Sequence, residues 1–143
     1  MFMGEYQHTL DAKGRMRMPS KFREELGDRF VVTRGTGKCL FVFADDEWQT
    51  FSQKIKTLPM TDQAIQTFVR LFFAGACETE VDAQGRILIP ANLRTLAELE
   101  KDVRVIGVAS RVEIWSEKNW NEYSENASDN FDDILGKMAE LGI

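Results

Sequence analysis

Asp11-Ala12-Lys13-Gly14-Arg15 returns in the second half of the chain as Asp82-Ala83-Gln84-Gly85-Arg86, 71 residues later (82 − 11). The match continues at the same offset through the pairs Pro19 and Pro90, Phe22 and Leu93, and Arg23 and Arg94. After one inserted residue it resumes with the pairs Gly35 and Gly107, Phe43 and Trp115, and Trp48 and Trp120. Self-similarity at a fixed offset over about 45 residues predicts a duplicated structural unit.

Each copy is predicted to form about four short strands and one small helix. After the first turn, arginine and methionine alternate from Arg15 to Met18. Because side chains alternate across a strand, the arginines share one face and the methionines share the other. Pro19 suits the first turn of a short helix that ends at Gly27. Two runs of residues that favour β-strands lie on either side of the Gly-rich turn at 34–38 and complete the copy. The second copy repeats this order.

Apolar stripes at helical spacing predict a helical hairpin between the copies and a further helix near the end of the chain. Pro59 separates the two stripes of the hairpin, and Thr61-Asp62 marks the start of the second. Ser128-Asp129 is predicted to cap the last helix, whose apolar face carries Phe131, Ile134, Leu135, Met138 and Leu141. Such stripes pack on a core or form subunit interfaces, and the sequence leaves both alternatives open.

The composition predicts a cytosolic protein with its own core. A chain of 143 residues that is 43% apolar and 29% charged can bury a core without disulfides or metal. No apolar run approaches the roughly 20 residues of a membrane span, and the first residues lack the features of a signal peptide. Cys39 and Cys77 have no metal-binding spacing, so we interpret them as small core residues. We expect no cofactor and no metal site.

The net charge of −5 is concentrated in the last part of the chain. From Glu117 onward there are seven acidic residues and two lysines, so residues 1–116 are neutral overall. Between His8 and Arg23 a single aspartate accompanies five basic residues, Lys13, Arg15, Arg17, Lys21 and Arg23. A solvated charged face is the simpler interpretation of an unrepeated cluster of this kind. Because the arginine-bearing turn is repeated, we favour a site for a polyanion.

The repeated turn is the candidate site. Asp11 and Asp82 are predicted to shape it by accepting backbone N–H groups, while the glycine adopts positive φ. The arginine after the glycine can contact phosphate or bind guanine O6 and N7 in the major groove. Alternatively, it pairs with the aspartate of its own motif and pins the turn. We predict DNA-binding residues at Lys13, Gly14, Arg15, Arg17, Gln84, Gly85 and Arg86.

The two copies are not equally basic. Gln84 stands in the place of Lys13, and Leu88 stands in the place of Arg17. We therefore expect unequal contributions to binding, with the first copy the stronger.

Several features occur together in this chain: two Asp-x-x-Gly-Arg turns, a proline and helix after each, their spacing, the Met-Phe-Met-Gly-Glu start and the helical linker. In combination they resemble the MraZ family of bacterial transcriptional regulators. The resemblance covers essentially the whole chain. It implies an α+β fold, mainly β, with tandem AbrB/SpoVT-like swapped-hairpin modules that form one pseudo-twofold barrel, plus a helical hairpin linker and a C-terminal helix. The modules are expected at residues 5–47 and 76–119, the linker at 48–75, and an acidic helical tail at 120–143.

The same resemblance implies a DNA-binding repressor in the cytoplasm and nucleoid. Its expected partners are double-stranded DNA and further copies of itself in a ring, with no membrane and no small-molecule substrate. The implied targets are G-rich direct repeats upstream of the division and cell-wall gene cluster, including its own promoter.

Other classes of protein fit the sequence less well. An AbrB-like antitoxin would also bind DNA and use an acidic tail to cover a toxin, but the tail here keeps an amphipathic helical pattern. An enzyme is not expected, because His8 is the sole histidine and no nucleophile, phosphate-loop or zinc motif is present. A purely structural ring would leave the arginine turns unexplained.

Overall fold

Each half of the chain folds into four strands and one short helix, in the order that the sequence predicts. The computed structural model describes residues 1–143. The first half contains β1 (Phe2–Thr9), β2 (Arg15–Arg17), α1 (Ser20–Leu26), β3 (Arg29–Arg34) and β4 (Cys39–Ala44), followed by α2 (Asp45–Lys56) and α3 (Gln63–Ala74). The second half contains β5 (Cys77–Glu80), β6 (Arg86–Leu88), α4 (Ala91–Leu96), β7 (Asp102–Ala109) and β8 (Arg111–Ser116), followed by α5 (Glu117–Asp129) and α6 (Phe131–Glu140).

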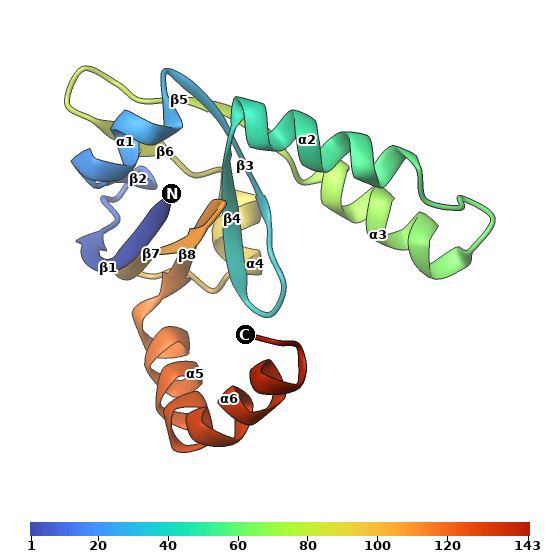
Figure 1. Ribbon diagram of the computed structural model, residues 1–143. Coiled ribbons are helices and arrows are strands. Elements are labelled where there is room, and N and C mark those ends of the chain that lie inside the picture. Colours follow the sequence, from blue (N-terminus) through green and yellow to red (C-terminus); the bar gives the residue numbers. More distant parts are fainter.

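The two halves exchange strands. The main sheet has the order β1-β7-β8-β4-β3-β5, and all of its neighbouring strands are antiparallel (Figure 1). Thus β1 pairs with β7 of the other half, β5 pairs with β3, and β2 and β6 form a separate two-stranded ribbon. Because each half completes the pairing of the other, neither can satisfy its backbone hydrogen bonds alone. This interleaving confirms the predicted swapped hairpins and their pseudo-twofold relation.

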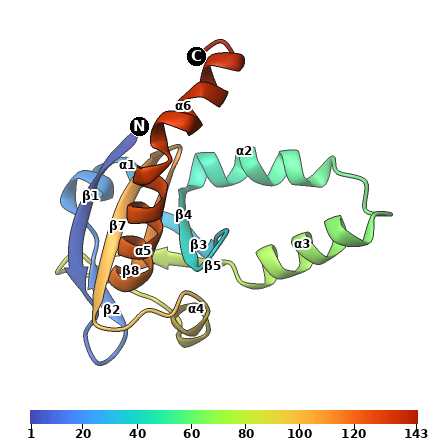
Figure 2. The same ribbon diagram turned by 90° about the horizontal axis from the view of Figure 1, so that it is seen from below.

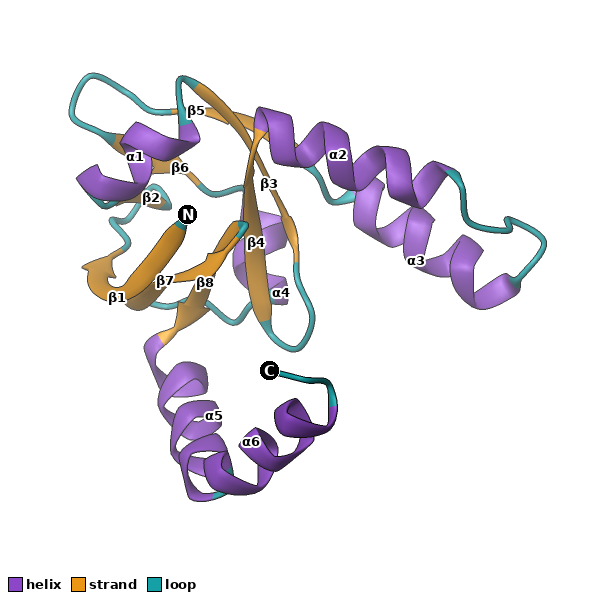
Figure 3. Cartoon of the chain, in the orientation of Figure 1, coloured by secondary structure: helices purple, strands orange, loops and turns teal.

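The main core lies between the sheet, the β2–β6 ribbon and the two short helices (Figure 3). It contains 18 buried apolar residues drawn from both halves. Met16, Met18, Ile87 and Ile89 point into it and are almost completely buried, which confirms the period-two pattern read from the sequence. Each large apolar side chain buried in this way contributes roughly 1.5–3 kcal/mol relative to exposure. The ribbon is therefore anchored by its inner face and leaves its outer face free.

The prolines stand one position earlier than the sequence suggested. Pro19 and Pro90 are the N-cap residues of α1 and α4, directly before the first helical turn. The carbonyl of Pro19 accepts hydrogen bonds from the backbone N–H groups of Phe22 and Arg23. Gly27 ends α1 with a positive φ of 77°, as predicted.

The predicted helical hairpin is formed by α2 and α3, which project from one side of the sheet (Figure 2). The Asp62 side chain caps α3 by accepting from the backbone N–H groups of Ala64 and Ile65. A second, smaller apolar cluster joins this hairpin to the sheet and includes Cys39, Phe41, Phe43, Phe72, Ile106 and Trp115.

The end of the chain differs from the prediction. Two helices, α5 and α6, meet at Asn130, and Ser128-Asp129 forms the end of α5 instead of a cap for the last helix. The N-cap of α5 is Ser116, whose hydroxyl accepts the backbone N–H of Asn119. Trp120 and Tyr123 then pack on Trp115 of β8, so tertiary contact holds a helix whose own apolar stripe is too narrow to predict it.

The two cysteines occupy different environments. Cys39 is buried as predicted, and burial followed by the Glu113 charge raises the pKa of its thiol to about 12. Cys77 lies half-buried on the edge strand β5, so its assignment to the core is wrong. None of the six helices combines the length and apolar character that crossing a membrane requires.

Candidate nucleic-acid interface

The two repeated turns have the same hydrogen-bonded geometry. One carboxylate oxygen of Asp11 accepts the backbone N–H groups of Lys13 and Arg15, each at 2.9 Å. Asp82 accepts those of Gln84 and Arg86, also at 2.9 Å each. The glycine of each turn has positive φ, 85° for Gly14 and 78° for Gly85, a region that side chains disfavour. The motif residues thus build one rigid turn twice.

Each turn arginine is held by the aspartate of its own motif. The Nε atom of Arg15 lies 2.8 Å from Oδ2 of Asp11, and the Nε atom of Arg86 lies 2.8 Å from Oδ2 of Asp82. This is the pairing that the sequence offered as the alternative to DNA contact. Both arginine side chains nevertheless keep about a third of their surface exposed, 32% and 30%.

The pairing leaves the ends of the guanidinium groups available. The two Nη atoms of Arg15 make no hydrogen bond within the chain, while Nη2 of Arg86 donates to Gln84 at 3.3 Å. A guanidinium fixed through Nε presents its two Nη groups in a defined direction, which is the geometry of a bidentate contact. Each turn arginine can therefore be held by its aspartate and still direct its Nη groups outward.

The β2–β6 ribbon gathers three arginines on its outer face. Its antiparallel register places Arg15 opposite Leu88, Met16 opposite Ile87, and Arg17 opposite Arg86. Directly opposed residues of an antiparallel pair project to the same side, so Arg15, Arg17 and Arg86 share the side away from the buried Met16 and Ile87. Leu88 lies among them with 56% of its surface exposed. Lys13 and Gln84 occupy the turns that flank the ribbon.

Two further arginines, missed as site residues in the sequence, brace the turns across the pseudo-twofold axis. A Cβ atom added to Gly14 would lie 2.6 Å from Cζ of Arg94, and one added to Gly85 would collide with the guanidinium of Arg23. Each half thus packs a helix arginine under the turn of the other half, and Nε of Arg94 donates to the carbonyl of Ile89 at 3.0 Å. The repeat offset had paired Arg23 with Arg94, which was the available signal.

Hydrogen bonds, burial and charge around the ribbon shift the pKa of three groups. The backbone hydrogen bond from Arg15 is the largest cause that lowers the pKa of Asp11, and Arg86 does the same for Asp82. On the adjacent strand β1, burial and then the Arg17 charge lower the pKa of His8, so this imidazole is mainly neutral near pH 7. The acidic helix α6 lies away from β2 in both ribbon views (Figures 1 and 2). The ribbon is therefore a local cationic surface on an acidic protein.

The carboxylates of Asp11 and Asp82 should make the free energy of unfolding depend on pH in the acid range. Their folded-state pKa values lie below the unfolded value of about 3.9, so their contribution is complete above that pH and is lost as pH falls through the folded pKa. The double variant Asp11→Asn with Asp82→Asn lacks this linkage. Its free energy of unfolding should fall less than that of the wild type between about pH 5 and pH 2. Urea denaturation at each pH measures this, and parallel curves for the two proteins would contradict it.

Comparison with known proteins gives a consistent match. The family described as "MraZ protein, putative antitoxin-like" matches residues 1–71 and again residues 72–140. A protein of Alkaliphilus metalliredigens named "Transcriptional regulator MraZ" is 54% identical over 143 residues, the full length of both chains. Proteins of the same name from Thermoanaerobacter pseudethanolicus and Acetivibrio thermocellus are 56% and 54% identical, again over the full length of both chains.

Proposed function

The chain belongs to the MraZ family and is a transcriptional regulator, and we propose that it recognises duplex DNA with the β2–β6 ribbon and its two flanking turns. The observation that carries this proposal is the collection of Arg15, Arg17 and Arg86 on one exposed face of a two-stranded ribbon. A ribbon of this kind fits the major groove of B-DNA, where base edges carry the full sequence code.

The chemistry of the face suggests what it reads. Arginine forms bidentate hydrogen bonds with O6 and N7 of guanine, which favours G-rich sites, and the exposed Leu88 suits an apolar contact such as a thymine methyl group. Lys13 is proposed to contact phosphate and so to increase affinity without adding sequence preference. Gly14 and Gly85 hold each turn in its positive-φ shape over Arg94 and Arg23, and so set where the turn meets the duplex.

A few cations per chain give modest affinity, so we propose that several copies act together in a ring. In a ring, rotation places every ribbon in the same orientation, which suits direct repeats of a DNA sequence. Tethering several ribbons in one assembly also raises the overall affinity, because it raises the effective concentration of each ribbon near the DNA. The proposed targets are G-rich direct repeats in the promoter of the division and cell-wall gene cluster, including the chain's own promoter. The outcome proposed there is repression, in the cytoplasm and in association with the nucleoid.

A gel shift with the chain's own upstream region, run over a salt series, tests the function. We expect shifted complexes on this duplex and weaker binding to a scrambled duplex of equal length. The logarithm of the binding constant should fall with the logarithm of salt concentration by about 0.9 per phosphate neutralised. A response that does not change with salt, or equal affinity for the scrambled duplex, would count against the proposal.

The antitoxin alternative keeps the same DNA interface and differs in what the tail binds. The exposed apolar stripe of α6 is the observation that favours it. Co-purification of a toxin encoded beside the gene, lost when α6 is removed, would support this alternative.

A further inference from the structure

The two halves carry equivalent aromatic clusters on the sheet face opposite the main core. In the first half, Phe43 contacts Trp48 and Phe51 with ring centroids 5.8 and 5.4 Å apart. Seventy-two residues later (115 − 43), Trp115 contacts Trp120 and Tyr123 at 5.4 and 5.1 Å. Each cluster joins the last strand of its half to the helix that follows, α2 or α5.

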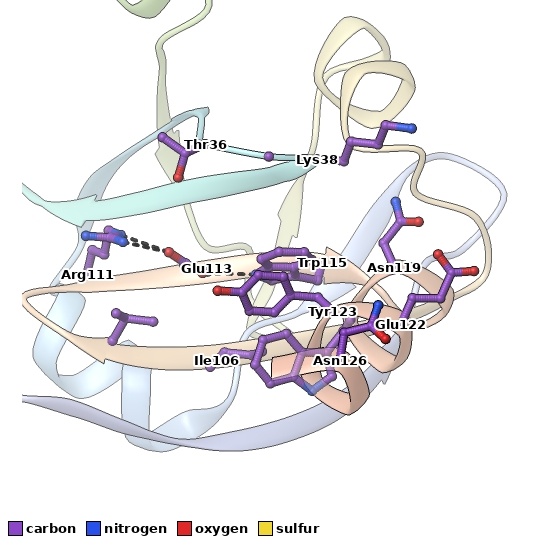
Figure 4. A pocket seen from close by; sticks show the side chains of 13 residues that line it. Thr36, Lys38, Ile106, Arg111, Glu113, Trp115, Asn119, Glu122, Tyr123 and Asn126 are labelled. Carbon is purple, nitrogen blue, oxygen red and sulfur yellow. Dashed lines mark hydrogen bonds and ion pairs between the residues drawn. The ribbon is translucent and has the colours of Figure 1, made fainter. Parts of the chain in front are cut away.

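Only the first cluster is covered by a second helix. Phe72 and Phe73 of α3 pack on Trp48 with centroids 5.6 and 5.5 Å away, and Phe72 is 3% exposed. The second cluster instead borders an open cavity of about 700 Å³ (Figure 4). Tyr123 lies in this cavity with 56% of its surface exposed. We call this cavity, with Ile106, Trp115, Trp120 and Tyr123 on its walls, the aromatic groove.

The helix that corresponds to α3 in the second half is α6, and it does not reach the groove of its own chain. Six residues, 57–62, connect α2 to α3, but Asn130 alone connects α5 to α6. Antiparallel helix pairs need connections of about two to eight residues, so α6 cannot fold back along α5 as α3 does along α2. The apolar stripe of α6 remains exposed at Phe131, Ile134 and Leu135, and Leu141 directly after the helix is exposed as well.

We propose that a second copy of this chain inserts the apolar face of its α6 into the aromatic groove, where α6 takes the place that α3 occupies in the first half. The proposal rests on the ring assembly proposed above and names its interface. The groove and α6 are different surfaces, so the contact is head-to-tail, and such contacts build rings or open filaments.

Charges at the margins of the two surfaces are complementary. Lys38 and Glu122 both border the groove (Figure 4). On α6, helical geometry places Asp132 on one side of the apolar stripe and Lys137 on the other. Lys38 already pairs with Glu98 of its own chain, with 2.7 Å between Nζ and Oε1. Docking can therefore add Asp132 to this ion pair as a second carboxylate and oppose Lys137 to Glu122.

Two single variants, each disabling one surface, test the interface. Tyr123→Arg places a cation in the groove and leaves α6 intact, whereas Leu135→Glu places an anion on the stripe and leaves the groove intact. Both side chains are about half exposed, at 56% for Tyr123 and 48% for Leu135. Because Tyr123 also packs on Trp115, circular dichroism and thermal unfolding check that each variant keeps the wild-type fold. Gly136→Glu is the matched control, because it adds the same charge one residue away, where a Cβ atom meets nothing within 4 Å.

Sedimentation velocity measures the assembly state. The wild type and Gly136→Glu should form oligomers, and each interface variant alone should be monomeric. An equimolar mixture of the two interface variants retains one intact groove and one intact helix, so it should form a heterodimer that grows no further. A monomeric wild type, oligomers from either variant alone, or a mixture that stays monomeric would overturn the interface.

DNA binding separates this inference from the proposed function. On a duplex with one repeat, the interface variants should bind like the wild type, whereas on several repeats they should bind at least about tenfold more weakly. A wild type that binds DNA as a monomer would overturn the interface alone. An oligomer that fails to bind DNA would overturn the proposed function and leave the interface standing.

Discussion

Replacing both turn arginines, Arg15→Ala with Arg86→Ala, is expected to lower affinity for the upstream duplex by at least about 100-fold at fixed salt. Each arginine that makes a bidentate base contact contributes about 1–3 kcal/mol, and the two lie on one face and act on the same groove. Fluorescence anisotropy with a labelled duplex measures the loss. Arg70→Ala, on the exposed surface of α3, is the matched control and should bind like the wild type.

The single variants should be unequal. Arg17 lies directly opposite Arg86 in the ribbon, so a cation remains there when Arg86 is removed. Leu88 lies opposite Arg15 and carries no charge that could replace it. Removing Arg15 also leaves Lys13 without the second cation of its turn. Arg15→Ala should therefore cost more affinity than Arg86→Ala. Equal losses for Arg15→Ala and the Arg70→Ala control would remove the first turn from the interface.

Gly107→Ala is expected to destabilise the protein by about 3 kcal/mol, because an added side chain meets backbone that cannot move aside. Gly107 lies in β7 directly opposite Gly4 of β1. Its Cβ atom would lie 2.6 Å from the Cα atom of Met3 and would displace the strand that crosses from the other half. Thermal unfolding should show a midpoint lowered by roughly 6–12 °C for a chain of this size.

Gly136→Ala is the matched control for that change. It lies inside α6 with no atom within 4 Å of an added Cβ. Because alanine favours the helix over glycine by about 1 kcal/mol, this variant should be slightly more stable than the wild type or equal to it. Equal midpoints for the two glycine variants would contradict the close approach of β1 and β7.

The duplication determined how much of the fold could be predicted. Alternation after the turn placed Met16 in the core and Arg17 outside, and the offset of 71 residues gave the second half the same order of elements. Helix α5 was not separated from the helical tail expected at 120–143, because contacts of Trp120 and Tyr123 with Trp115 hold it on the sheet, and helical periodicity does not reveal such contacts. The single-residue connection at Asn130 also became visible only when both helices were placed.

The site was less predictable than the fold. Asp-x-x-Gly-Arg allows its arginine to bind the aspartate or a ligand, and the same residues satisfy both possibilities. Only geometry separates the Nε atom, which is held by Asp11, from the free Nη atoms of Arg15. The bracing by Arg23 and Arg94 depends on packing between halves, which no local pattern records. Proximity of Arg17 to Arg86 likewise follows from strand exchange, because the two residues belong to different copies.

Photo-crosslinking from the turns to DNA tests the central claim most directly. A photoreactive residue is placed at Lys13 or Gln84 in the turns, or at Thr67 on α3 or Glu125 on α5 as controls, and each protein is irradiated with the upstream duplex. We predict crosslinks from Lys13 and Gln84 and none from the two controls. Crosslinks from Thr67 or Glu125, with none from either turn, would contradict the assignment of the ribbon as the DNA-binding surface.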